Sequence, residues 1–147
     1  MRLEVSHVVK APPEKVYAAY TDFEAMPKWS KHLSSVRVTK REGDTVYLES
    51  EGVSSTGRQR KTFGTLRLLP LTRVESDSET RYTRSKRTVA FETVPEGAGT
   101  KVTATLDVQV KGLWAKVLST RVSKDEAESS AMEELLSFAR FVEGSSQ

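Results

Sequence analysis

The longest stretch of the chain without proline or glycine runs from Leu113 to Glu143. Apolar residues recur within it at the spacing of one helical face: Trp114, Val117, Leu118, Met132, Leu135, Leu136, Ala139 and Val142. This period predicts a single helix over Gly112–Val142. At 1.5 Å per residue, a helix of roughly 30 residues is about 45 Å long, so it is the element best able to cover a whole sheet.

The apolar face of this helix is interrupted in the middle. At 100° per residue, Arg121, Asp125, Glu128 and Ser129 fall on the same face. Burying an unpaired charge is costly, so two explanations stay open: the middle of the helix reaches solvent or a loop, or it covers a polar-lined cavity. In the second case, Met132–Val142 would fix the helix in place and Trp114–Ser129 would cover the cavity.

The chain before the helix carries strand patterns separated by short turns. Leu3, Val5, His7 and Val9 alternate with polar residues and predict a first strand. Two short helices follow, one begun by Pro12-Pro13 and one over Phe23–Ala25 that Asp22 could cap. Six more strands are expected at Val36–Thr39, Thr45–Ser50, Gln59–Leu69, Arg73–Asp77, Lys86–Val94 and Lys101–Val110. Short connections make the sheet antiparallel, within a single domain over 1–143 and a flexible tail at 144–147.

Strand alternation also predicts which residues face the interior. In the last strand the inward row is Val102, Ala104, Leu106, Val108 and Val110, and Phe91 should face the same way. For Gln59–Leu69 the pattern decides neither face, so Arg60 is either interior or solvated. His7 shares the apolar face of its strand, either as a cavity acid or base or as a core histidine bonded to a backbone carbonyl.

Composition excludes several kinds of chemistry. The chain has no Cys, and its two His residues, His7 and His32, are too far apart in sequence to suggest a metal site, so we expect neither metal nor cofactor. A net charge of +3 is too small to indicate nucleic acid. No apolar run reaches the roughly 20 residues of a membrane span, and we expect a soluble, cytoplasmic protein. The basic residues of one hairpin form either a solvated tip or a patch for an anionic partner, membrane phosphate or RNA: Arg81, Arg84, Lys86 and Arg87.

Three motifs resemble a known family. Val9–Tyr17, Thr21–Glu24 and Met26–Trp29 are similar to the opening of the START/Bet v 1-like superfamily, in particular its polyketide cyclase/dehydrase and coenzyme Q-binding branch. Gly99–Val102 resembles the start of that family's last strand. The resemblance implies an α+β helix-grip fold, with a seven-stranded antiparallel sheet wrapped around the C-terminal helix and a lipophilic ligand between them. His7 and the polar middle of the helix depart from the family pattern and argue against a purely hydrocarbon ligand.

The first functional hypothesis is a carrier or binding module for a lipid, isoprenoid quinone or polyketide-like molecule. An apolar chamber with a few polar groups is the usual composition of such sites. Its expected ligand-binding residues are Trp29, Leu48, Arg60, Phe91, Leu106, Val108, Leu118, Arg121, Asp125, Ser129 and Met132.

Two other hypotheses remain. A polyketide cyclase or dehydratase would use His7 as acid or base, with Arg121 or Arg60 stabilising an enolate and Asp125 orienting the arginine. An interaction module without a ligand would use Phe138 and Phe141, which lie away from the main helical stripe and would otherwise pack beneath the N-terminal helices. We expect a monomer or a weak homodimer.

Overall fold

The computed structural model describes residues 2–53, 57, 59–79, 83–94, 99–110, 112 and 124–144, apart from the side chains of Arg60 and Val110. Its elements, in chain order, are β1 (Arg2–Val9), α1 (Pro13–Thr21), the 3₁₀ helix η1 (Phe23–Lys28), β2 (Leu33–Glu42), β3 (Thr45–Val53), β4 (Gln59–Leu69), β5 (Arg73–Glu79), β6 (Thr83–Thr93), β7 (Thr100–Val110) and α3 (Lys124–Gly144).

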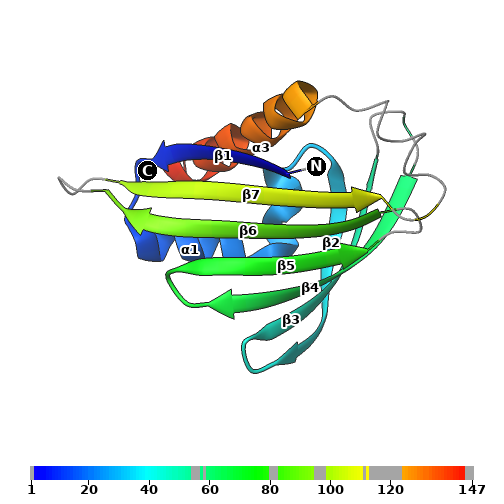
Figure 1. Ribbon diagram of the computed structural model, residues 1–147. Coiled ribbons are helices and arrows are strands. Elements are labelled where there is room, and N and C mark those ends of the chain that lie inside the picture. The colour runs from blue at the N-terminus through cyan, green and yellow to red at the C-terminus, as the bar shows by residue number, and fades with distance from the viewer. Residues whose placement is uncertain are drawn as a thin grey trace.

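The strands form one antiparallel sheet in the order β1-β7-β6-β5-β4-β3-β2. Figure 1 shows the sheet curving so that α1 and α3 lie on its concave side. The predicted helix-grip fold, with seven antiparallel strands, two short helices after the first strand and a terminal helix, is confirmed. No helix in the described part of the chain combines the length and the apolarity needed to cross a membrane.

Alternation along the strands separates a core-facing row from an outer row. Leu3, Val5 and Val9 are buried on β1, and His7 lies on the same face but is only half-buried. In β4, Leu66 is 5% exposed whereas Phe63 is 61% exposed. The sequence left this strand undecided because it carries apolar residues on both faces. The structure shows that the face with Leu66 and Leu68 is the inner one.

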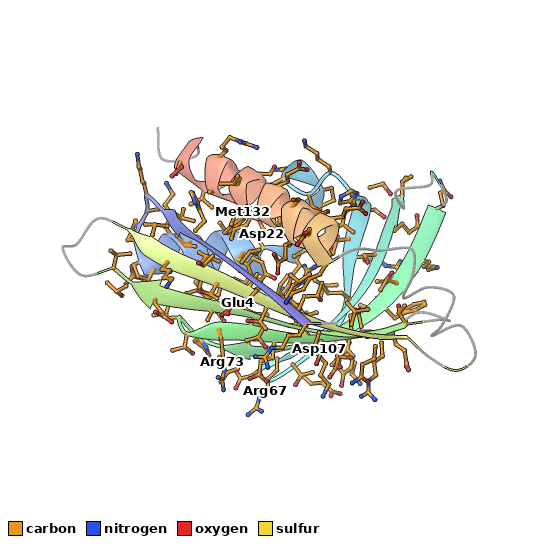
Figure 2. All side chains as sticks on the ribbon, turned by 45° about the horizontal axis from the view of Figure 1, so that its top comes forward. Glu4, Asp22, Arg67, Arg73, Asp107 and Met132 are labelled. Carbon is orange, nitrogen blue, oxygen red and sulfur yellow. The ribbon has the colours of Figure 1, made fainter. Side chains whose placement is uncertain are left out.

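The outer face of the sheet is charged. In Figure 2, Arg67 and Arg73 point away from the helices on this face. Across three neighbouring strands, Glu49 accepts ion pairs from Arg37 at 2.6 Å and from Lys61 at 2.5 Å. Hydrogen bonds from Lys61 and Arg37 hold the pKa of Glu49 below its usual value. Opposite charges on adjacent strands therefore neutralise one another here.

The short helices follow the predicted order, but η1 is longer than expected. Asp22 is its N-cap residue and its backbone carbonyl accepts a hydrogen bond from Ala25 N–H at 3.0 Å. The predicted helix ended at Ala25, but η1 continues through Pro27 to Lys28, because the fixed φ of proline is compatible with a 3₁₀ turn. Met26 O instead accepts bonds from the N–H groups of Trp29 and Ser30, at 3.1 and 2.8 Å, and these close the element.

The terminal helix is held from two sides. Its buried residues are Leu135, Phe138, Ala139 and Val142. Phe138 is 1% exposed, so of the two alternatives for this residue, packing beneath the N-terminal helices is confirmed. These residues have the i, i+3, i+4, i+7 spacing of one helical face, and both β1 and the α1–η1 segment pack against the helix. Residues 113–123, which include the first part of the predicted helix, lie outside the described residues.

The start of β2 is fixed by a close backbone contact. Gly52 in β3 has no side chain, and a Cβ there would collide with the backbone carbonyl oxygen of His32, which also accepts a hydrogen bond from Val53 N–H at 3.0 Å. This contact positions the segment that immediately follows Trp29.

We predict that Gly52→Ala lowers the free energy of unfolding by about 1–3 kcal/mol, the usual cost of overpacking. The measurement is urea denaturation followed by circular dichroism. Gly64→Ala is the matched control, because a Cβ at this glycine, also in a strand, would meet its neighbours only at 3.6 Å or more. Equal effects of the two substitutions would contradict the assigned contact.

Candidate ligand-binding cavity

A cavity lies between the concave face of the sheet and α3. Its apolar walls come from β1, β6, β7 and α3: Leu3, Val89, Val102, Ala104, Leu106, Ala131, Leu135 and Phe138. Four side chains with polar atoms complete the lining: Tyr20, Trp29, Arg87 and Glu134. Its volume is about 50 Å³, enough for a few water molecules or for one end of a larger ligand.

Arg87 reaches this cavity because of its place in the sheet register. One inward row crosses six strands in the order Val46, Leu66, Ser76, Arg87, Leu106 and Leu3. Arg87 is therefore flanked in the sheet by Ser76 and Leu106, on the face that packs against the helices. Arg87 lies deep in the protein although part of its surface remains accessible. A charge in this position is costly unless it is paired or hydrogen-bonded.

Two groups compensate the charge of Arg87. The Tyr20 hydroxyl and the negative charge of Glu134 both stabilise the charged guanidinium. Burial by itself would lower the pKa of Arg87, but Glu134 and Tyr20 outweigh it and raise that pKa. The guanidinium has five N–H donors, so an interaction with Tyr20 leaves other donors of Arg87 available.

Burial shifts the pKa of Tyr20 in the opposite direction from that of Arg87. Desolvation raises the pKa of its phenol, and Glu134 raises it further, while Arg87 acts to lower it. Tyr20 is 7% exposed and packs edge-on against Phe91 and Phe138, each with ring centroids 5.7 Å apart. At neutral pH it is therefore a neutral hydrogen-bonding group in a rigid aromatic setting.

Trp29 is fixed in place but keeps an unused donor. Its backbone carbonyl accepts a 2.6 Å hydrogen bond from Ser137 Oγ on α3, and its ring lies 4.9 Å from that of Phe138. Its Nε1 is buried and has no hydrogen-bond partner among the described residues. An unpaired buried donor costs free energy, and a bound acceptor would remove that cost.

Glu134 enters the cavity from α3. Its Oε1 accepts a 3.0 Å hydrogen bond from Ser30 Oγ, just after Trp29. The same residue borders a second hollow of about 10 Å³, toward His32 and Ser137. Glu134 is half-buried, so its carboxylate stands between the cavity and the protein surface.

The residues expected to bind a ligand are distributed unevenly. Trp29 and Leu106 line the cavity. Phe91 lies in the core, and its ring packs against that of Tyr20. Met132 and Leu48 are partly buried against the same core, and Leu48 also borders a separate groove beside Phe63.

Other candidates lie farther away or cannot be placed. Val108 is half-buried, farther along the inward face of β7, and Asp125 and Ser129 are exposed near the start of α3. Leu118, Arg121 and the side chain of Arg60 lie outside the described residues. The roles assigned to all of these residues, and to His7, stay predictions.

Arg87, Tyr20 and Glu134 are the polar cavity residues that the sequence analysis missed. Arg87 was grouped with Arg81, Arg84 and Lys86 as either a solvated hairpin tip or a patch for an anionic partner. Arg84 and Lys86 are exposed and Arg87 is half-buried, whereas Arg81 lies outside the described residues. The signal was present in β6: Val89 and Phe91 face inward, so alternation places Arg87 on the same side. The prediction for Arg87 followed its positive charge rather than this strand alternation.

The setting of Tyr20 predicts its alkaline titration. Because its folded-state pKa is raised, the stabilisation from the neutral phenol is fully present below the unfolded-chain value of about 10 and is lost as the pH rises through the folded value. Ultraviolet titration should detect late-ionising phenols, and Tyr20→Phe should remove one of them. If Tyr20→Phe instead removed a phenol that ionises early, the buried environment assigned to Tyr20 would be contradicted.

Comparisons with known proteins agree with this architecture. The model of the family described as "Polyketide cyclase / dehydrase and lipid transport" matches residues 9–132. A search of curated proteins found no significant match. Among solved structures, TTHA0849 from Thermus thermophilus is similar over 100% of both chains, with 24% identity and a TM-score of 0.83.

Two further structures share the fold at lower identity. The Zhui aromatase/cyclase from Streptomyces sp. R1128 has 11% identity and a TM-score of 0.85 over 100% of this chain and 96% of that one. The di-domain ARO/CYC StfQ of the steffimycin biosynthetic pathway has 14% identity and a TM-score of 0.78 over 99% of this chain and 52% of its own. Because the family model covers most of the sequence, the chain belongs to the polyketide cyclase/dehydrase and lipid transport family.

Proposed function

We propose that the protein binds an amphipathic small molecule between the sheet and α3, with an oxygen-bearing end directed at Arg87 and Trp29. The observation that carries this proposal is the coexistence of spare donors with apolar walls in one cavity. Sites for small molecules are mostly apolar, with a few polar groups that orient the ligand.

The size of the cavity defines which part of the ligand it receives. Sites for drug-sized molecules measure roughly 300–1,000 Å³, whereas this cavity measures about 50 Å³. It therefore accommodates the polar end of such a ligand, and we expect it to widen when the remainder binds. Lipids, quinones and polyketide-like molecules all combine an oxygenated end with an apolar body.

The first test uses 2-acetylnaphthalene, an uncharged aromatic ketone, as the probe. The ketone oxygen would accept hydrogen bonds from Arg87 and Trp29, and the rings would contact the apolar walls. Because a hydrogen bond to a charged group contributes about 1.5–3 kcal/mol, Arg87→Met should weaken binding about tenfold or more, as measured by isothermal titration calorimetry.

Arg84→Met provides the matched control for this test. Arg84 lies on the same strand, but its side chain is 57% exposed and its Nε lies 3.9 Å from Asp77 on the outer face. Affinity should be unchanged in this variant. Absence of probe binding to the native protein, or equal losses in both variants, would contradict the proposal.

A second candidate function is proton transfer at a carbon next to a carbonyl group. The observation that favours it is the presence of a carboxylate, Glu134, and a carbonyl-polarising cation, Arg87, in one cavity. Abstraction of such a proton needs a base and stabilisation of the resulting enolate. This pair could replace His7, Arg121 and Asp125 in the predicted cyclase or dehydratase mechanism.

This activity predicts exchange of the methyl protons of 2-acetylnaphthalene in deuterium oxide, followed by proton NMR. Glu134→Gln should reduce the protein-catalysed rate by about 100-fold or more, the usual contribution of a general base. Glu133→Gln, an exposed neighbour on the same helix, should leave the rate unchanged. If the native protein does not accelerate exchange, the carrier function alone remains.

A further inference from the structure

Two opposite charges line the same cavity, and they come from opposite walls. Arg87 projects from β6 in the sheet and Glu134 from α3. Each influences the ionisation of Tyr20, and Glu134 influences that of Arg87. The cationic end of the cavity is therefore already partly neutralised by the protein itself.

This arrangement affects ligands differently according to their charge. A carboxylate entering the cavity would lose its hydration and meet Arg87, whose charge Glu134 already offsets. It would also bring a second negative charge close to Glu134 in an apolar enclosure, where like charges repel strongly. An uncharged ketone or quinone oxygen loses much less hydration on entry and is not repelled.

Glu134 lines the cavity and keeps acceptor capacity beyond its hydrogen bond from Ser30. Ser30 Oγ donates to one of its oxygens, Oε1. An ionised carboxylate has two oxygens and about four lone-pair sites, so it retains acceptor capacity for a hydroxyl donor on a ligand. In contrast, Arg87 and the Trp29 Nε1, which has no partner in the described part of the chain, offer donors only.

We infer that Glu134 is a specificity-determining residue: it excludes carboxylate-bearing ligands from the cavity and selects ligands with an uncharged oxygen at their polar end. This inference rests on the proposed binding function and adds the ligand class. Free fatty acids are thereby excluded, whereas neutral aromatic ketones, quinones and phenols are accepted.

The test compares two probes of nearly the same shape, 2-acetylnaphthalene and 2-naphthoate. A methyl group in the first takes the place of a carboxylate oxygen in the second, so charge is their main difference. Binding of both is measured by isothermal titration calorimetry at neutral pH, with the native protein, Glu134→Gln and the control Glu133→Gln. Thermal unfolding of each variant without probe confirms that it is folded.

The native protein should bind the ketone at least tenfold more tightly than the acid. In Glu134→Gln, affinity for the acid should rise at least fivefold while affinity for the ketone changes by less than threefold. The control should retain the preference of the native protein.

Three outcomes would overturn the inference. Equal or tighter binding of 2-naphthoate by the native protein, or an unchanged preference in Glu134→Gln, would remove Glu134 as the selecting residue but leave the proposed binding function in place. Binding of neither probe by the native protein would remove both.

Discussion

The packing of Phe138 against Tyr20 and Trp29 of the N-terminal helical segment, with Tyr20 in turn against Phe91 of the sheet, supports the whole cavity. Its ring contacts Trp29 at 4.9 Å and Tyr20 at 5.7 Å, and it is 1% exposed. The hydrogen bond from Ser137 to the Trp29 carbonyl strengthens the same junction. Since aromatic side chains bury large areas and pack with defined geometry, this cluster sets the distance between α3 and the sheet. This aromatic cluster also positions the polar residues that line the cavity.

The location of charge distinguishes the two faces of the sheet. On the outer face, ion pairs such as Arg73–Glu75 are well exposed and contribute little to stability. On the inner face, Arg87 stands in an otherwise mainly apolar row and needs Tyr20 and Glu134 nearby. A leucine would pack there without such compensation. A buried charge of this kind is weak evidence for stability and better evidence for a binding role.

The family and the fold do not by themselves identify the ligand. Solved structures that resemble this chain include an aromatase/cyclase and a START superfamily protein from Mycobacterium smegmatis, at 11% and 17% identity. One fold hosts many functions, so function has to be argued from the site. The proposed function depends on Arg87, Trp29 and Glu134, and none of these roles follows from the shape of the backbone.

The sequence by itself determined the order of the elements, because strand and helix periods are local properties that hydrophobic spacing records directly. Alternation was sufficient for β7, where apolar and polar residues separate cleanly, but not for β4, where both Phe63 and Leu66 are apolar. Only the tertiary structure decided which face of β4 is buried, that Arg87 faces the helix, and that Glu134 rather than Glu133 reaches the cavity. Those outcomes depend on sheet register and on the rotation of α3 against Trp29 and Phe138, which bring together residues far apart in the chain.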